Sequence, residues 1–293
     1  MTDDARGGVR PSCPCRVAVL IPTYNNPEGL RRSLASVASA EGEWVVVVVD
    51  DGSNPPIDPH DVAPLSSKTV VLRNSTNKGV AAALNEGLRY IMAQPGFEYI
   101  ARLDAGDEVH PARFVKQLEC FQADGRLGIV GSWVAFVDRV NPAETFVYCA
   151  PSSSSEVRRT MPVRNVLIHP TVMMKKRVIE EVGRYSMRLE ACEDYDLFWR
   201  ILRQYEGMNI PEVLTFCEQN AKGISSGNRR GQLWSKLRIQ LAHFSLSCEA
   251  AAGVAVTVVG LILPYALVRR MRRWRFLRSL TFVESYGQRG QMR

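Results

Sequence analysis

The sequence predicts an α/β fold: a mixed, mostly parallel sheet with flanking helices, followed by a helical C-terminal segment that associates with a membrane. Three observations lead to this prediction. Short, continuous apolar runs such as Val17–Ile21 and Trp44–Val49 are typical of strands buried on both faces. Stretches with the apolar spacing of a helix separate these runs, which indicates β–α–β units. Near the end of the chain, Ala250–Val268 is 19 residues long and carries no charge.

The predicted elements of the main domain follow one another regularly. The strands are expected at 17–21, 44–49, 69–72, 99–103 and 129–137. The helices are expected at 28–40, 79–93, 111–123 and 194–204, with a Ser-rich loop at 152–155. The stretch 28–40, for example, places Leu30, Leu34 and Val37 on one face. Two further helices are expected near the C-terminus, at 232–247 and 250–263.

The composition of the 293-residue chain is that of a globular protein. Hydrophobic residues make up 46% and charged residues 23%, which excludes a wholly disordered or collagen-like chain. The seven Cys form no C-x-x-C motif, so we interpret them as reduced thiols and not as a zinc site or a disulfide framework. A chain of this length can bury a substantial core.

The formal net charge of +7 is concentrated at the end of the chain. From Arg269 onward there are eight Arg and one Glu, so this tail carries +7 and the preceding 268 residues are neutral. A neutral body argues against a nucleic-acid partner. A basic tail after an apolar run favours a surface with anionic lipid headgroups.

We expect three parts along the chain. Residues 1–15 are interpreted as a disordered leader, because they lack the apolar stretch of a secretory signal. Residues 16–225 carry the alternating strands and helices and form the main domain, and residues 226–293 form the helical C-terminal region. Without an export signal, the main domain is expected in the cytoplasm.

Polar residues follow each of the first four predicted strands. In chain order the clusters are Pro22–Asn25, Asp50–Ser53, Asn74–Asn77 and Asp104–Asp107. Ligands of open α/β sheets bind beyond the carboxyl ends of the strands. One such cluster is commonly a turn or a helix cap. Four at one edge, two of which contain a pair of carboxylates, predict a binding site there.

These clusters resemble motifs of the inverting family 2 glycosyltransferases, which have the Rossmann-like GT-A fold, in particular those of bacterial cell-envelope and exopolysaccharide synthesis. The similar segments read VAVLIPTYNNPEGLRRSLASV, VVVVVDDGS, NKGVAAALNEGL, YIARLDAGDEVHPARF, HPTVMMKK and EDYDLFWRIL. They span most of the chain, from about Val17 to Leu202. The resemblance implies transfer of a sugar from a nucleotide-sugar donor to a glycan or lipid-linked acceptor with inversion.

The resemblance also implies how the donor is held. Tyr24 would stack on the base, and Asp51 would accept a hydrogen bond from a base N–H. Arg102 would face the diphosphate or pair with a carboxylate. The full set of implied donor-binding residues is Pro22, Thr23, Tyr24, Asp51, Asn77, Arg102 and Asp104.

A divalent cation is expected, because the departing diphosphate builds up negative charge that Mn²⁺ or Mg²⁺ held by carboxylates can neutralise. In the family, an Asp-x-Asp motif after the fourth strand supplies the ligands. Here the second position of that motif is Gly106, and the next carboxylate is Asp107. We expect Asp104 and Asp107 to share the role, directly or through water. The alternative for Asp107 is a cap of a turn.

The acceptor hydroxyl must lose a proton as it attacks, so a general base is needed. By resemblance this base is Asp194, with Glu193 and Asp196 as weaker candidates. Glu193 and Asp194 open a helix-like stretch, so N-capping by Asp194 is an alternative or additional role. His169 matches a family position near the acceptor, and a structural role for it stays open.

The C-terminal apolar run is long enough to cross a membrane. However, Gly260 and Pro264 interrupt it, an Arg cluster follows it, and the main domain needs cytoplasmic donors. We therefore expect a re-entrant or interfacial segment that holds the protein to the cytoplasmic face of the membrane. A buried helix is the alternative.

Two other functions stay open. A sugar-phosphate nucleotidyltransferase has a similar sheet, but it would need a Gly-rich loop with a Lys where Pro22–Asn26 stands. The other is a catalytically weak, glycosyltransferase-like protein that only binds nucleotide. One feature favours it: Gly106 stands where the family's Asp-x-Asp motif has its second Asp.

Overall fold

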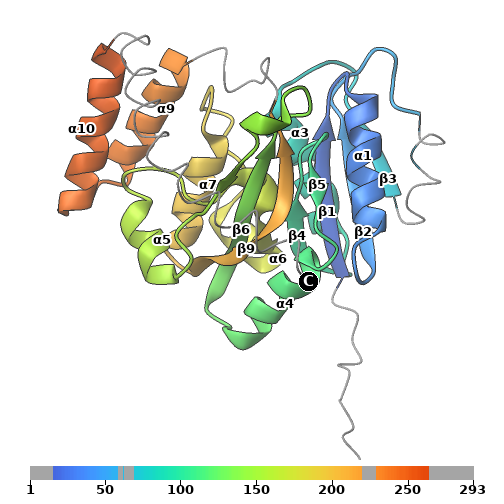
Figure 1. Cartoon of the computed structure of the whole chain (residues 1–293), viewed down its shortest axis with the longest axis horizontal. Helices are drawn as coiled ribbons and strands as arrows, with labels where there is room; N and C mark the ends of the chain where they lie inside the picture. Colours follow the sequence, from blue (N-terminus) through green and yellow to red (C-terminus); the bar gives the residue numbers. More distant parts are fainter. Residues whose placement is uncertain (1–15, 59–61, 63–68, 220–228, 264–293) are drawn as a thin grey trace, which may run out of the picture.

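The computed structural model describes residues 16–58, 62, 69–219 and 229–263 (Figure 1). Nine strands of these residues form one sheet with the order β3-β2-β1-β4-β8-β6-β9-β5, and β7 pairs with β6. The strands are β1 (Arg16–Thr23), β2 (Trp44–Asp50), β3 (Thr69–Arg73), β4 (Phe97–Arg102), β5 (Glu108–Val109), β6 (Leu127–Val137), β7 (Phe146–Tyr148), β8 (Met173–Lys175) and β9 (Glu206–Glu218).

Helices cover both faces of this sheet (Figure 1). They are α1 (Pro27–Ala38), α3 (Val80–Ala93), α4 (Arg113–Ala123), α5 (Ser154–Thr160), α6 (Lys176–Val182), α7 (Glu193–Leu202), α9 (Arg229–Ala242) and α10 (Cys248–Ile262), with short 3₁₀ helices at Pro142–Glu144 and His169–Thr171. Every strand and helix predicted for the main domain is present, with ends that differ by a few residues. The α/β prediction is confirmed.

The sheet has a parallel and a mixed half. β3, β2, β1 and β4 are parallel, so their carboxyl ends meet at one edge. Beyond β4, the pairs β4–β8, β6–β8, β6–β7 and β5–β9 are antiparallel. The pair β6–β9 is the one parallel pair of this half among the described residues. The expectation of a mostly parallel sheet is wrong for this half. Strands β5, β7 and β8 have only two or three residues, too few to leave an apolar run in the sequence.

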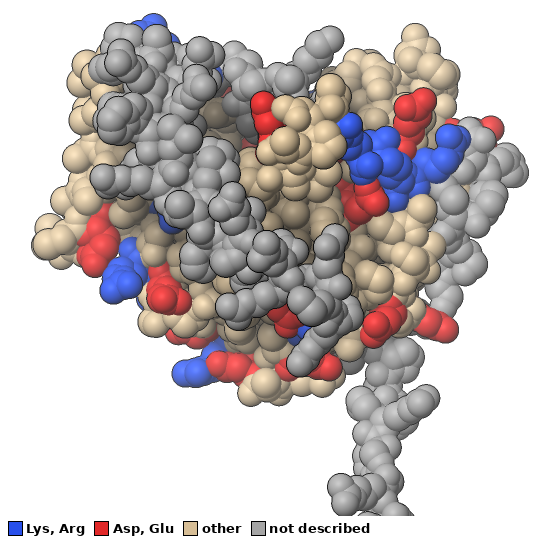
Figure 2. All heavy atoms as spheres, in the orientation of Figure 1, with Lys and Arg blue, Asp and Glu red and all other residues tan. Residues whose placement is uncertain are grey.

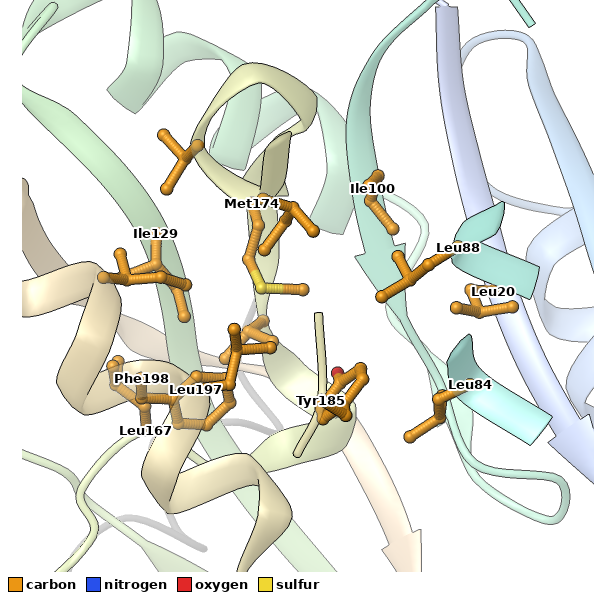
Figure 3. Close-up of a cluster of buried hydrophobic side chains, with 14 of the residues drawn as sticks. Leu20, Leu84, Leu88, Ile100, Ile129, Leu167, Met174, Tyr185, Leu197 and Phe198 are labelled. Carbon is orange, nitrogen blue, oxygen red and sulfur yellow. The ribbon is translucent and has the colours of Figure 1, made fainter. Parts of the chain in front are cut away.

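The core consists of two apolar clusters, one on each face of the sheet. Neighbouring residues of β2 belong to different clusters because side chains alternate along a strand. Val46 lies with Leu30 of α1 and Phe114 of α4, whereas Val47 lies with Leu84 of α3. Figure 3 shows the cluster that contains Leu84, which extends across the sheet to α7. Burial on both faces explains the continuous valine run of β2.

The Ser-rich stretch begins a helix and is not simply a loop. Ser153 is the N-cap of α5, and its side-chain oxygen accepts a hydrogen bond from the backbone N–H of Glu156. The Glu156 carboxylate accepts in return from the backbone N–H of Ser153, which completes a capping box. The Ser-x-x-Glu pattern that signals this start is present in the sequence, and the loop interpretation missed it.

The two C-terminal helices pack onto the main domain. Ile239 of α9 belongs to the same core cluster as α7, and Gln240 donates a hydrogen bond of 2.8 Å to the carbonyl of Pro162. α10 packs against α9. Helices predicted at 232–247 and 250–263 are thus present, at 229–242 and 248–262. No helix within the described ranges is long and apolar enough to span a membrane. The rest of the predicted membrane segment, residues 264–268, and the basic tail lie outside those ranges.

Candidate functional site

An acidic turn follows β4 at the edge where the parallel strands end. The backbone N–H of Asp107 donates 3.1 Å to the carbonyl of Asp104, which closes the turn. Gly106 has a φ of +116°, a backbone conformation that a residue with a Cβ rarely adopts. The departure from Asp-x-Asp therefore has a conformational reason: the middle of this turn requires glycine.

Two side chains of α1 hold this turn in place. The Ser33 hydroxyl donates 2.7 Å to the carbonyl of Asp107 and accepts 2.9 Å from the backbone N–H of Gly106. Asn26, the N-cap of α1, donates 2.9 Å to the carbonyl of Ala105. Our sequence interpretation missed both residues. The available signals were the Asn-Pro start of the helix and a polar residue, Ser33, on its buried face.

Asp104 forms an ion pair with Arg102 at the floor of the site. The Arg102 side chain is 1% exposed and the Asp104 side chain is 46% exposed. The carboxylate of Asp104 therefore faces solvent while it pairs with a buried guanidinium group. Although burial acts to raise it, the charge of Arg102 holds the pKa of Asp104 below its ordinary value. The prediction left open whether Arg102 meets the diphosphate or a carboxylate, and in this structure it pairs with the carboxylate.

Asp107 is more enclosed than Asp104. It is 6% exposed, and its Oδ1 accepts 3.0 Å from the backbone N–H of Glu218, at the end of β9. Burial, followed by the neighbouring charge of Asp104, raises the pKa of Asp107 to about 7. Asp107 thus joins the acidic turn to β9, in addition to lying beside Asp104.

Ion pairs line the rim of the site beside the acidic turn. Arg32 of α1 pairs with Glu218, and Arg139 pairs with Glu108 and lies 3.8 Å from Glu218. Figure 2 shows Lys and Arg side chains gathered next to Asp and Glu side chains over α1, at the upper right of that view. Charges of both signs therefore lie beside the acidic turn.

The carboxylate of Asp51 organises the loop after β3. Its Oδ1 accepts 2.7 Å from the side chain of Asn74, and its Oδ2 accepts 2.8 Å from the backbone N–H of Gly79. The backbone N–H of Lys78 lies 3.1 Å from both oxygens. Asn77 is exposed in the same loop, and its Oδ1 accepts from Gly79. The carboxylate is largely occupied by these protein donors.

The loop after β1 lies next to this region. Pro22 and Thr23 are buried, and the Thr23 hydroxyl has no partner among the residues that the structure describes. Tyr24 is 48% exposed, so its ring is available to a ligand. The backbone N–H of Asn25 donates 2.9 Å to the side chain of Ser53, which joins the loops after β1 and β2. The structure therefore brings the predicted nucleoside residues to one edge.

Asp194 lies in the first turn of α7. Its Oδ2 accepts 3.0 Å from the side chain of Asn165, and its Oδ1 accepts 2.7 Å from the backbone N–H of Tyr195. The N-cap of α7 is Cys192, in a left-handed conformation with φ +63°, so Asp194 is not the cap. Burial, with the adjacent Glu193, raises the pKa of Asp194 to about 7.

His169 and Tyr185 connect the acidic turn with the start of α7. His169 Nε2 and the Tyr185 hydroxyl are 2.8 Å apart. Burial and the charge of Arg102 lower the pKa of His169 to about 3, so this imidazole is neutral. Burial raises the pKa of Tyr185, which experiences the charges of both Arg102 and Asp194. Sequence analysis missed Tyr185, because nothing marks a Tyr in a loop.

Comparison with known proteins identifies the family. A family model described as "Glycosyl transferase family 2" matches residues 18–183, more than half of the chain. The chain belongs to glycosyltransferase family 2. The matched region contains the acidic turn, the loops after β1, β2 and β3, and His169, but it ends before Asp194.

Relatives of known sequence are also glycosyltransferases. The pre-mycofactocin glycosyltransferase of Mycobacterium tuberculosis is 33% identical over 197 residues, which cover 64% of this chain and 39% of that protein. The chain thus spans about two fifths of that relative. The amylovoran biosynthesis glycosyltransferase AmsE of Erwinia amylovora is 24% identical over 283 residues, which cover 93% of this chain and 99% of that protein.

Solved structures of glycosyltransferases share the GT-A fold of this one. S. aureus TarS 1–349 in complex with UDP-GlcNAc has a TM-score of 0.62 at 14% identity, and covers 84% of this chain and 72% of that chain. The mannosyltransferase PcManGT from Pyrobaculum calidifontis, in complex with GDP-Man and Mn²⁺, has a TM-score of 0.58 at 18% identity. The match covers 92% of this chain and 84% of that chain. At these identities the likeness concerns the fold.

The glycosyltransferase offers one well-placed carboxylate for a divalent cation. Asp104 is partly exposed and engages only Oδ1 with Arg102, so its second oxygen is available to an ion. Asp107 fits less well, because it is enclosed and already bonded to β9. Within the described ranges, no group of three or more His, Cys, Asp or Glu is arranged around an ion position. An ion bound through Asp104 would take its other ligands from phosphate oxygens and water.

Proposed function

We propose that this glycosyltransferase moves a sugar from a nucleotide-sugar donor to a glycan or lipid-linked acceptor with inversion at the anomeric carbon. The main support for this proposal is the raised pKa of Asp194. A general base works best when its pKa lies near the working pH, and the pKa of Asp194 is raised to about 7. Asn165 and the Tyr195 backbone N–H aim the carboxylate, and the described residues give it no ion-pair partner.

The nucleoside of the donor would bind between the loops after β1, β2 and β3. The exposed ring of Tyr24 would cover the base, and the unpartnered hydroxyl of Thr23 would donate a hydrogen bond to the nucleoside. Asp51 would act mainly through the loop that it anchors, since its oxygens already accept from Asn74 and Gly79. TarS and PcManGT were solved with UDP-GlcNAc and GDP-Man, so both a uracil and a guanine donor belong in any test.

The diphosphate would lie over the acidic turn. Asp104 is the proposed ligand of a Mn²⁺ or Mg²⁺ ion, which would neutralise the leaving group when bound. PcManGT was solved with Mn²⁺, which supports this choice of ion. Arg102, 1% exposed and paired with Asp104, would hold the carboxylate in its ionised form and aim it.

The proposed reaction is a single displacement. The acceptor oxygen forms a bond to the anomeric carbon while its proton passes to the carboxylate of Asp194. The bond between the anomeric carbon and the diphosphate oxygen breaks, and the nucleoside diphosphate leaves with the electron pair. Because attack and departure occur on opposite faces of the sugar, the configuration inverts.

Donor hydrolysis tests this assignment without the natural acceptor, because water can replace the acceptor hydroxyl. With Mn²⁺ and a panel of UDP- and GDP-sugars, Asp194→Asn should lower the rate about 10²- to 10⁴-fold. Binding of the nucleoside diphosphate should stay unchanged. Glu193→Gln tests the weaker candidate base, one residue away, and should retain most activity if Asp194 is the base. Asp194→Asn activity within threefold of the unmodified enzyme would exclude Asp194 as the base.

We further propose a role in polysaccharide synthesis at the cytoplasmic face of the membrane. AmsE, which aligns with 93% of this chain, is named for amylovoran biosynthesis. The surface of α9, α10 and the turn between them exposes Trp234, Leu241, Phe244, Leu246, Val256, Val259 and Ile262. Such a surface, followed in the sequence by eight Arg, suits an interfacial anchor on anionic lipid.

Vesicle sedimentation tests the membrane proposal. The full chain should bind vesicles that contain an anionic lipid, and binding should weaken as salt increases. Neutral vesicles should bind much less. Trp234→Ser combined with Leu246→Ser should reduce binding, whereas Val140→Ser, at a fully exposed valine far from α9 and α10 in the sequence, should not. Equal binding by both variants would contradict this surface.

A further inference from the structure

A cavity lies at the end of the sheet opposite the proposed catalytic edge. It has a volume of about 470 Å³ and is lined by the first residues of β4, the end of β8 and parts of α4 and α6. Tyr99 lines this cavity, whereas Asp104 follows the other end of the same strand. At about 3.3 Å per residue, the two positions are roughly 16 Å apart. The cavity is therefore separate from the donor site.

A buried ammonium group faces this cavity without a carboxylate partner. Lys175 is 8% exposed, and its Nζ donates 2.9 Å to the carbonyl of Gly125 and lies 5.3 Å from the centre of the Phe121 ring. No carboxylate within the described ranges lies within 4.0 Å of it. Burying a charge without a close counter-charge is costly. Burial and the nearby Arg177 lower the pKa of Lys175, and the charge of Asp124, more than 4.0 Å away, only partly opposes them. An anion in the cavity would supply a counter-charge in direct contact.

The neighbouring charges limit how much negative charge the cavity can accept. Lys176 donates 2.8 Å to the carbonyl of Gln94 and lies 3.9 Å from Glu180, so it is largely engaged. Arg177 is exposed at the rim, as is Glu98. Three cations and two carboxylates line the cavity, which leaves a net charge of about +1. A ligand with one anionic group fits this balance better than a polyanion.

Aromatic rings form the other wall. The rings of Tyr99 and Phe121 are 5.1 Å apart with an interplanar angle of 35°. Phe121 is 3% exposed and supports Tyr99 from inside the protein, whereas Tyr99 is partly exposed. The apolar face of an aromatic ring such as that of Tyr99 packs well against the C–H face of a sugar ring. The volume lies within the range of small-molecule sites, about 300–1,000 Å³, and is sufficient for one or two sugar rings.

We infer that this cavity is an accessory site for a saccharide that carries a single phosphate or carboxylate group, with Lys175 as the anion ligand and the ring of Tyr99 as the surface on which the sugar packs. The site does not depend on the proposed catalytic role of Asp194. It would hold an acidic sugar, free or at the end of a glycan, while the catalytic edge acts on another part of the substrate.

Ligand-observed NMR with the full chain tests the inference. The probes are glucose 6-phosphate, glucuronic acid, glucose and inorganic phosphate, each measured with UDP and GDP present in excess to occupy the donor site. At least one of the two anionic sugars should bind at least tenfold more tightly than glucose and inorganic phosphate. Binding of glucuronic acid would assign the carboxylate form, and binding of glucose 6-phosphate the phosphate form.

Two variants and a control locate the binding. Lys175→Met should weaken binding at least tenfold, and Arg177→Gln, at an exposed position that does not threaten folding, should weaken it severalfold. Lys116→Met is the control, because Lys116 is an exposed cation on α4 that pairs with Glu212. The inference is overturned if neither anionic sugar binds, if inorganic phosphate binds equally well, if the nucleotides displace the probe, or if folded Arg177→Gln and Lys175→Met bind it like the unmodified chain.

Discussion

The side-chain amide of Asn165 donates a hydrogen bond of 3.0 Å to Oδ2 of Asp194, across 29 residues of sequence. The Oδ1 atom of Asn165 accepts 3.1 Å from the backbone N–H of Leu167, so the amide is oriented by its own loop. A donor to the ionised carboxylate favours that form and partly offsets the burial that raises the pKa of Asp194. Asn165 is therefore a positioning residue for the proposed base.

Replacement of Asn165 should change the pH profile of the enzyme. In Asn165→Ala the ionised carboxylate loses a donor, so its pKa should rise and the rising limb of kcat against pH should move to higher pH. We expect kcat to fall about tenfold at pH 7, with little change in KM for the donor. Asn165→Gln, which retains an amide, should recover part of the rate. A lower kcat with an unshifted profile would contradict this role.

The rate of the unmodified enzyme should increase with pH through about 7. The proposed base is active only when Asp194 is ionised, and its pKa is about 7. Steady-state donor hydrolysis between pH 5 and 9, at saturating Mn²⁺, measures this limb. The residual rate of Asp194→Asn should not show it. Because the pKa of Asp107 is also raised to about 7, a limb that persists in Asp194→Asn would indicate Asp107 instead.

Asp194→Asn should stabilise the protein without donor. The unfolded carboxyl group loses its proton near pH 4, whereas the folded one keeps it until about pH 7. Ionisation therefore opposes folding, and stability falls as pH rises from about 4 to 7. The variant should melt a few degrees higher than the unmodified chain at pH 8, and the difference should vanish at pH 4.

Asp196, two residues further along α7, provides a control, because its replacement should change the melting temperature in the opposite direction. Burial acts against its ionisation, but His243 and Arg200 outweigh this and lower its pKa, so its charge favours folding above pH 4. Asp196→Asn should therefore melt lower than the unmodified chain at pH 8 and approach it as pH falls below about 4. Thermal melts of both variants across this range give the comparison. Shifts of the same sign would contradict the assigned pKa directions.

Ser33→Ala should disturb the acidic turn, which this side chain of α1 contacts directly. The hydroxyl bonds to Asp107 and Gly106, and its loss leaves a buried carbonyl and a buried N–H without partners. Such a loss typically costs about 1–3 kcal/mol. We expect a lower melting temperature and several-fold weaker Mn²⁺-dependent binding of nucleoside diphosphate. Ser39→Ala, at the exposed end of the same helix, should change neither.

Two C-terminal deletions should distinguish the residues needed for folding from those needed for membrane binding. The ring of His243 stacks on Trp199 of α7 with centres 5.3 Å apart, and Ile239 lies in the core. A chain ending at residue 228 should therefore be strongly destabilised, as judged by thermal melting. A chain ending at residue 263 should fold and hydrolyse donor, but bind anionic vesicles less. A stable chain ending at residue 228 would show that α9 is dispensable for folding.

The order of the longer strands and helices from β1 to β6 could be predicted from the sequence alone, whereas β5, β7, β8, β9, α5 and α6 were not predicted. β2 is buried on both faces, so it appears as an unbroken valine run, and α1 repeats its apolar residues at helical spacing. Buried parallel strands and amphipathic helices impose such local patterns. The polar clusters after β1, β2 and β4 are equally local, and they indicated correctly that polar side chains gather at one edge of the sheet. That this edge binds the donor stays a prediction.

Only the tertiary structure decided what each carboxylate can do. The sequence placed Asp104 and Asp107 together as shared ligands, yet Asp107 is bonded to Glu218, 111 residues away, and Asp104 remains partly exposed. Burial is the main cause of the raised pKa of Asp194, and Asn165 orients its carboxylate; the residues next to Asp194 in the sequence reveal neither. Burial, hydrogen-bond partners and nearby charges set the chemistry of an ionisable group. In this fold they come from segments that only packing brings together.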